Sequence, residues 1–180
     1  MDVKQIPVTN REEKELYAMV DDEDFERLER CRWYLSMGRY AVTTFKSPRK
    51  NGESCSIHLR MHRLIMNTPR ELDVDHINGN GLDNRKVNLR NCTMSQNKMN
   101  SRAKLVGKTS IYKGVYFDKE VNKFRAYIGL AGKNTYVGIS KSQIVAAKMY
   151  DEAAIRYFGE FARPNFPTAK TIPPLVASHE

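Results

Sequence analysis

The sequence is short of cysteine and of long apolar runs, and each shortage excludes a class of protein. The three cysteines, Cys31, Cys55 and Cys92, are an odd number without a Cys-x-x-Cys pair. This argues against a disulfide framework and a structural zinc site, and it favours a reducing cytosol. No apolar run approaches the length of a membrane span. Residues 1–15 also lack the apolar region of a secretory signal, so no membrane association is expected.

What the chain does have is positive charge, and this charge is unevenly distributed. Its 180 residues carry a formal net charge of +9. Residues 1–100 hold 17 Lys and Arg against 15 Asp and Glu, whereas residues 101–180 hold 13 against 6. The basic C-terminal half suggests a polyanionic partner, although a solvated basic surface explains the charge equally well.

Local patterns in residues 1–66 predict an α+β arrangement. A helix is expected over residues 21–31, because acidic residues begin it and its apolar residues share one face. Strands are expected at residues 39–45 and 56–61, and the Asn-Gly turn signal between them predicts a hairpin. Residues 61–66 predict a short helix that Asn-Thr-Pro ends.

Residues 73–97, DVDHINGNGLDNRKVNLRNCTMSQN, place one histidine among many asparagines. The pattern predicts a strand through Asp75 and His76, a loop rich in Asn and Gly, and a second strand after Asn88. A helix is expected next, with Asn97 in its first turn, because Thr93 and Gln96 have capping-box spacing.

This segment has residues that phosphodiester hydrolysis would need. Neighbours on a strand point to opposite faces, so Asp75 is placed to hold a metal while His76 deprotonates a water. Mg²⁺ prefers a few hard oxygen ligands, and Asp75 with the amide oxygen of Asn97 would supply two of them. Asn88 would brace the loop through its side chain. From spacing alone, a polar surface loop that happens to contain a histidine is the favoured interpretation.

Residues 61–100 resemble the HNH homing endonucleases of the phage and intron-encoded type. The shared elements stand in order: His62-Arg63, Asp75-His76, the Asn-Gly loop, Asn88-Leu89 and a final Ser-x-Asn. The resemblance implies a ββα-metal fold.

The same resemblance implies a role for each motif residue. His76 matches the general base, and Asp75 and Asn97 match the metal ligands. Asn88 matches the middle asparagine, which braces the loop and holds the histidine in place. The last motif position is His in many relatives and Asn here, which favours Mg²⁺ or Mn²⁺ over Zn²⁺.

Other residues near this motif have two interpretations each. Arg63 is expected either to contact the scissile phosphate or only to pack the helix against a strand. Residues 98–110 are interpreted as a linker in which Arg102 and Lys104 follow the phosphates or belong to a solvated tether. The remaining polar loop residues are expected to form turns: Asn78, Asn80, Asp83 and Asn84.

Residues 111–167 predict a small unit of three strands followed by a helix. Ser140 with Gln143 has capping-box spacing, Ile139 with Ile144 has hydrophobic-staple spacing, and Gly159 suits the helix end. The strands are expected at residues 113–117, 123–129 and 134–139.

Alternation assigns one face of this sheet to the core and leaves the other face open. The inner residues of the last strand are expected to be Val137 and Ile139. The open face is expected to collect Tyr116, Lys123, Arg125, Tyr127 and Tyr136, with Lys113 and Lys133 at its edges. Cations and aromatic rings on one side of a sheet suit a DNA groove. The alternative is an ordinary half-buried sheet with polar outward residues.

This unit resembles the plant Apetala-type (ethylene-response-factor) DNA-binding domain through Tyr-x-Gly-Val, Tyr-Asp-x-Ala-Ala and Asn-Phe-Pro. The resemblance implies that the sheet enters the major groove. Plant members carry several Arg and Trp on the reading face, whereas this chain has mostly Lys and Tyr with Arg125. Phosphate contact is therefore expected rather than base reading. The same domain also occurs fused to HNH nucleases.

Together these patterns predict an α+β DNA endonuclease of the homing type, acting in the cytoplasm of a bacterial host if a phage encodes it. Its partner would be double-stranded DNA, hydrolysed with one Mg²⁺ or Mn²⁺ per site. A monomer would nick and a homodimer would cut both strands, and the sequence leaves this open. A DNA-binding regulator with an inactive nuclease fold is the alternative, and it predicts salt-sensitive binding without cleavage. The expected regions are a nuclease at 1–100 with its core at 61–100, a linker at 101–110, a DNA-binding domain at 111–167 and a tail at 168–180.

Overall fold

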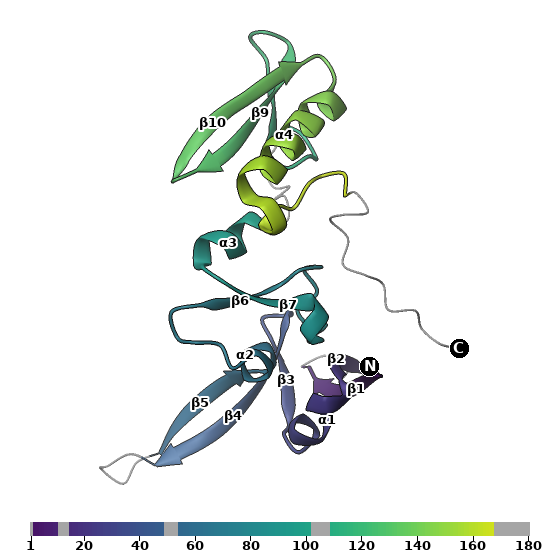
Figure 1. Cartoon of the computed structure of the whole chain (residues 1–180), viewed down its shortest axis with the longest axis vertical. Helices are drawn as coiled ribbons and strands as arrows, with labels where there is room; N and C mark the ends of the chain where they lie inside the picture. Colours follow the sequence, from purple (N-terminus) through teal and green to yellow (C-terminus); the bar gives the residue numbers. More distant parts are fainter. Residues whose placement is uncertain (1, 11–14, 49–53, 102–108, 168–180) are drawn as a thin grey trace. The chain divides into compact units, whose positions relative to one another are not determined.

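The computed structural model describes residues 2–10, 15–48, 54–101 and 109–167. It is a mixed α+β structure that divides into two compact units, Met1–Met94 and Ser95–Glu180 (Figure 1). Among the described residues, no helix is long and apolar enough to cross a membrane.

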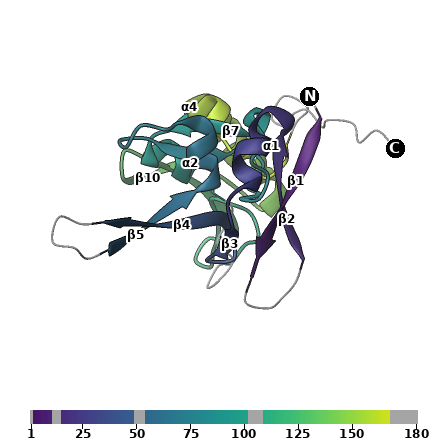
Figure 2. The ribbon, with the colours of Figure 1, turned by 90° about the horizontal axis from the view of Figure 1, so that it is seen from below.

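A five-stranded sheet forms the framework of the first unit, in the order β2-β1-β3-β4-β5 (Figure 2). Strands β1 and β3 run parallel, and the other neighbours are antiparallel. The sequence predicted the β4–β5 hairpin, but it did not predict β1 and β2. The strands are β1 (Val3–Thr9), β2 (Leu16–Asp21), β3 (Trp33–Ser36), β4 (Tyr40–Pro48) and β5 (Ser54–Arg60).

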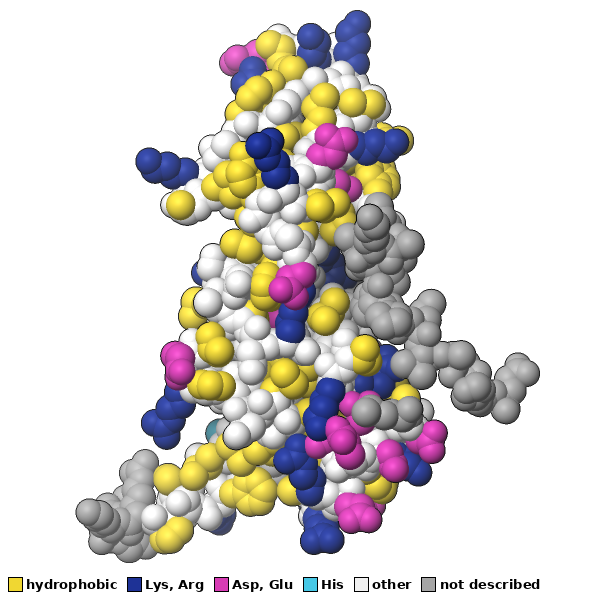
Figure 3. All heavy atoms as spheres, viewed as in Figure 1, with side chains coloured by type: hydrophobic (Ala, Val, Ile, Leu, Met, Phe, Trp, Pro, Cys, Tyr) yellow, Lys and Arg dark blue, Asp and Glu magenta, His cyan; other side chains and the backbone are white. Residues whose placement is uncertain are grey.

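The core of this unit lies between the sheet and two short helices, α1 (Asp22–Glu29) and α2 (Met61–Met66). Both helices were predicted. Trp33 is buried and donates a hydrogen bond from Nε1 to the carbonyl of Leu28, 2.8 Å away, which ties β3 to the end of α1. Figure 3 shows acidic side chains gathered over the part of this unit that contains α1, where the side chains of Asp22 and Glu23 are exposed.

The segment with the histidine follows α2. Strands β6 (Asp73–His76) and β7 (Leu89–Cys92) pair antiparallel, with a single 3₁₀ turn, η1 (Lys86–Asn88), at the end of the loop between them. Helix α3 (Met94–Met99) comes next. The predicted order of strand, loop, strand and helix is therefore present.

The second unit has a three-stranded antiparallel sheet, β10-β9-β8, with one long helix on one face. Its elements are β8 (Val115–Asp118), β9 (Lys123–Leu130), β10 (Lys133–Ser140), α4 (Gln143–Phe158) and the 3₁₀ turn η2 (Gly159–Phe161). Ala146, Ala147 and Ala154 are fully buried against the sheet, because their small side chains let the helix approach closely.

The predicted start of helix α4 is wrong by two residues. The N-cap is Ser142, whereas Ser140 is still the last residue of β10. The Ser140 hydroxyl accepts a hydrogen bond from the backbone N–H of Ser142, so it shapes the turn before the helix and does not cap it.

A β-bulge in β10 also overturns the predicted side of Ile139. The register shifts between Tyr136 and Gly138, so that Gly138 lies opposite Ala126 and Ile139 lies opposite Arg125. Directly opposite residues of an antiparallel pair share a face. Val137 packs against the core as predicted, but the extra residue turns Ile139 to the open face.

Asp151 on α4 holds the end of the second unit in place. One of its carboxylate oxygens accepts from the backbone N–H and the side-chain amide of Asn165, at 2.7 and 2.9 Å. The other accepts from the backbone N–H of Phe166, at 2.9 Å. Asn165 in turn exchanges hydrogen bonds with the backbone of Lys113. The Asn-Phe-Pro segment is thereby fastened to both α4 and the start of the sheet.

Candidate functional site

His76 is the last residue of β6, and it is 5% exposed. Its Nε2 lies 3.3 Å from Oδ1 of Asn84, a fully buried residue of the following loop. Burial lowers the pKa of His76, and this outweighs the Asn84 hydrogen bond and the Asp75 charge, which raise it. The imidazole is therefore neutral at neutral pH and able to accept a proton.

Two other rings surround this imidazole. Tyr40, at the start of β4, stacks on His76 with 5.7 Å between ring centroids, and His62 on α2 meets it edge-on at 4.9 Å. Tyr40 and His62 also meet each other at 5.1 Å. Burial lowers the pKa of His62 to about 3, so this ring is neutral as well. Tyr40 and His62 together fix the plane of the His76 ring.

Asp75 is paired across the two-stranded ladder with Arg90, a residue that the sequence did not single out. The register places the two residues directly opposite each other. Arg90 donates from Nε and Nη2 to one carboxylate oxygen of Asp75, at 2.9 and 2.6 Å. Asp75 is only 4% exposed, and the arginine holds its carboxylate in one orientation.

The loop between β6 and β7 is held together by its own amide and carboxylate side chains. Asn88 donates from Nδ2 to the carbonyl of Asp83 at 2.8 Å and accepts from the backbone N–H of Asn78 at 3.0 Å. Asp83 accepts from Asn78 and receives a bidentate bond from Arg85. These contacts explain why the loop is rich in asparagine.

Strand β2 anchors the same loop to the five-stranded sheet. The backbone of Met19 accepts from the N–H of Asn84 and donates to the carbonyl of Leu82, both at 2.8 Å. Asp21 accepts from the N–H of Lys86 at 2.7 Å. The position of Asn84 beside His76 therefore depends on a strand that the sequence analysis did not predict.

Arg63 is placed where it holds the loop between α2 and β6. Its guanidinium donates to the carbonyls of Leu72 at 2.7 Å, Pro69 at 2.8 Å and Thr68 at 3.3 Å. It also lies 4.0 Å from the carboxylate of Asp73. This is a structural role of the kind that the sequence left open, and contact with DNA stays a prediction.

The second predicted metal ligand, Asn97, lies on α3 within the second unit, and its role stays a prediction. Arg102 and Lys104 lie outside the described residues. Within the described ranges, no three His, Cys, Asp or Glu side chains gather as a metal site. A cation bound by Asp75 would therefore need amide oxygens, water or substrate to complete its coordination.

The open face of the second sheet carries a row of three tyrosines. Tyr127 meets Tyr136 with 5.7 Å between ring centroids and Tyr116 with 6.2 Å, both edge-on. Arg125 lies opposite Tyr116 and forms an ion pair with Asp118 at 2.9 Å. Lys123 lies opposite Asp118 on the same face.

The two lysines predicted for the edges of this face, Lys113 and Lys133, lie in different surroundings. Lys133 is exposed at the start of β10. Lys113 donates to the carbonyl of Met99 at 2.6 Å, and its ammonium lies 6.0 Å from the ring centre of Tyr150 on α4. Lys113 is thus on the helix side of the sheet, away from the tyrosine row.

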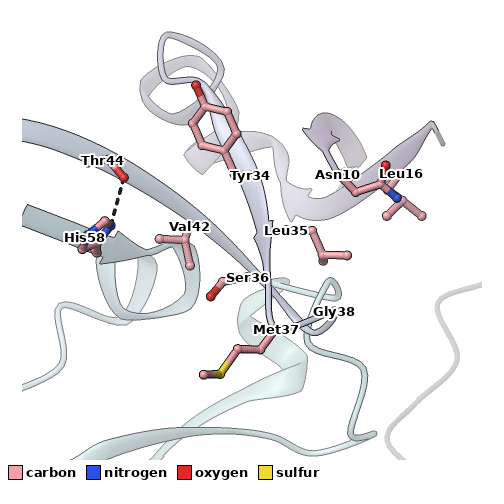
Figure 4. A pocket seen from close by; sticks show the side chains of 10 residues that line it. All are labelled: Asn10, Leu16, Tyr34, Leu35, Ser36, Met37, Gly38, Val42, Thr44 and His58. Atoms are coloured by element: carbon pink, nitrogen blue, oxygen red, sulfur yellow. Dashed lines mark hydrogen bonds between the residues drawn. The ribbon is translucent and has the colours of Figure 1, made fainter. Parts of the chain in front are cut away.

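A groove of about 800 Å³ lies on the outer face of the first sheet (Figure 4). The His58 ring is 3.0 Å from the Thr44 hydroxyl across β4 and β5. None of the described residues that line the groove is Asp, Glu, Lys or Arg. The lining residues are Asn10, Leu16, Tyr34, Leu35, Ser36, Met37, Gly38, Val42, Thr44 and His58.

Comparison with known proteins gives one match that includes the segment around His76. Residues 67–99 match the HNH endonuclease family. The chain is also similar to a protein of Acanthamoeba polyphaga mimivirus named as an uncharacterized HNH endonuclease. The two are 29% identical over 154 residues, which cover 84% of this chain and 76% of the mimivirus protein. Both matches support a nuclease function.

Proposed function

We propose that this chain is a metal-dependent DNA endonuclease of the homing type, with its active site on strands β6 and β7. One observation carries the proposal: a buried, neutral imidazole, His76, adjoins the carboxylate Asp75 inside the segment that matches the HNH family. A histidine without a carboxylate would suit many sites, whereas this pair suits phosphodiester hydrolysis.

His76 acts as the general base. With Oδ1 of Asn84 as the acceptor, Nε2 of His76 carries the hydrogen and Nδ1 carries the lone pair. Nδ1 then takes a proton from the water that attacks the phosphorus. Tyr40 and His62 keep the ring plane fixed during this transfer, and Asn88 keeps the loop that carries Asn84 closed.

Asp75 and Asn97 would hold the cation, Mg²⁺ or Mn²⁺. Their oxygen atoms are the hard donors that these ions prefer, and the buried Asp75 is already oriented by Arg90. When bound, the ion supplies positive charge to the phosphate and the leaving oxygen.

The second unit binds double-stranded DNA through the open face of its sheet, as an Apetala-type domain does. Tyr116, Tyr127 and Tyr136 supply aromatic surface, and Lys123 and Arg125 supply charge. The regulator with an inactive nuclease fold remains the second candidate, because such a protein would bind DNA through the same face.

Plasmid nicking tests the nuclease proposal directly. We expect the purified full chain to convert supercoiled plasmid to open circles with Mg²⁺ or Mn²⁺ and to stop when EDTA is added. A plasmid library is the substrate of choice because the target sequence is unknown. Salt-sensitive binding to the library without any metal-dependent cleavage would instead support the regulator.

Replacing Arg125 and Tyr127 together with alanine is expected to weaken DNA binding by about 10- to 100-fold. The change removes one cation and the central ring of the tyrosine row. Fluorescence anisotropy with labelled duplex measures the affinity. The matched control is Lys148→Ala with Tyr157→Ala, which removes a cation and a ring from the exposed surface of α4. Equal losses in both double variants would contradict a binding role for the sheet.

A further inference from the structure

Two arginines flank the ring that covers His76. Arg39 immediately precedes β4, and Arg60 is the last residue of β5. Their guanidinium carbons lie 5.5 and 5.8 Å from the ring centre of Tyr40, the ring that stacks on His76. Both arginine side chains are exposed. Both guanidinium groups therefore lie beside the ring that stacks on His76, one from the turn before β4 and one from the end of β5.

Among the described residues, these two arginines have no acidic partner. The other arginines of the site have acidic partners: Arg90 with Asp75, and Arg85 with Asp83. Within the described parts of the chain, no carboxylate lies within ion-pair distance of Arg39 or Arg60. Arg39 is close enough to lower the pKa of His76 by its charge, and Arg60 acts likewise on His62.

Both arginines are attached to parts of the site that are tightly packed. A side chain at Gly81 would place its Cβ 2.2 Å from the carbonyl oxygen of Arg39, so the loop that follows His76 lies directly on the Arg39 backbone. Arg60 is the N-cap of α2, two residues before His62, which meets the His76 ring. The backbone of each arginine is thus held at a fixed place relative to the imidazole.

We propose that Arg39 and Arg60 bind the DNA backbone, and that each contacts a phosphate next to the scissile phosphate. Guanidinium groups match phosphate oxygens with paired donors, and both groups lie within cation–π distance of the Tyr40 ring. The partner is a polyanion, since two exposed arginines without a carboxylate partner among the described residues adjoin the ring that stacks on His76. This inference rests on the proposed function, because it assumes that the substrate phosphate lies at His76.

The test uses Arg39→Gln, Arg60→Gln and the double variant of the full chain, with duplex DNA as the probe. Each phosphate contact contributes about −0.9 to the slope of log affinity against log salt concentration. We expect each single variant to reduce the magnitude of the slope by roughly one and the double variant by roughly two. The matched control is Arg32→Gln, an exposed arginine that precedes β3. Trp33 fluorescence verifies that every variant is folded.

The outcomes separate this proposal from the nuclease proposal. Reduced slopes for Arg39→Gln and Arg60→Gln, with an unchanged slope for Arg32→Gln, support the proposed phosphate contacts even if the wild-type chain never nicks a plasmid. Unchanged slopes for Arg39→Gln and Arg60→Gln overturn the proposed contacts even if the wild-type chain nicks efficiently. An equal loss in the Arg32→Gln control also overturns them, because the effect would then be one of net charge.

Discussion

Replacing His76 is expected to reduce metal-dependent nicking by about two to four orders of magnitude while leaving DNA affinity nearly unchanged. His76→Gln is the preferred variant. The side chain packs between Tyr40 and His62, so alanine would leave a cavity, whereas glutamine keeps most of the volume and cannot act as a base near neutral pH. Plasmid nicking gives the rate, and anisotropy with duplex DNA gives the affinity.

The matched control for this substitution is His58→Gln. His58 is exposed on β5 and hydrogen-bonds with the Thr44 hydroxyl, and it is not one of the rings that contact His76. We expect this variant to nick at the wild-type rate. Nicking by His76→Gln at the wild-type rate would show that another group is the base. Loss of affinity together with nicking would show that His76 is needed for the fold of the site.

Asp151→Asn is expected to destabilise the second unit by about 2 to 3 kcal/mol. The carboxylate of Asp151 accepts three N–H groups, two from Asn165 and one from Phe166, and the residue is buried. An amide of the same shape has one oxygen and one NH₂ group. The NH₂ group would face a donor, so at least one buried N–H would lose its acceptor. Urea denaturation followed by far-UV circular dichroism measures the free energy of unfolding.

Glu152→Gln provides the control for Asp151→Asn, because it removes the same charge from the neighbouring exposed position of α4. Its effect should be below about 0.5 kcal/mol. The single tryptophan, Trp33, reports separately on the first unit. An effect of Asp151→Asn no larger than that of Glu152→Gln would contradict the role of the carboxylate in fastening the C-terminal segment.

Much of the second unit was predictable because its signals are local. Strict alternation in Phe124, Ala126 and Ile128 identifies β9 and its buried face, and the latter two residues are fully buried. In β10 the alternation rule fails after the bulge at Val137, because one inserted residue moves every later side chain to the opposite face of the sheet. Strands β1 and β2 were missed because Pro7 separates the two buried residues of the first, Ile6 and Val8, and the unbroken apolar run over residues 16–20 hides the alternation of the second.

In the candidate site too, residues that are close in sequence could be predicted, whereas residues that meet only in the folded structure could not. Asp75, His76 and Asn88 stand in one continuous motif, so the sequence indicates them together. Tyr40, Asn84 and Arg90 did not stand out, because their importance comes from what they touch. Arg90 meets Asp75 only through the strand register, and Tyr40 reaches His76 from a different sheet. Pairings across long loops cannot be found from periodicity.

The hydrogen bonds between Met19 and the loop that joins β6 to β7 limit where the chain can be divided without losing the site. A fragment that began at residue 61 would carry the whole recognisable motif, yet it would lack the backbone partners of Leu82 and Asn84 and the aromatic ring of Tyr40. Under the proposed function, a fragment that keeps the site intact must include β1 and β2 as well as the motif. Under the proposed function, gene fusions that exchange the second unit should join the chain after the motif, and those that cut between β2 and α2 should be inactive.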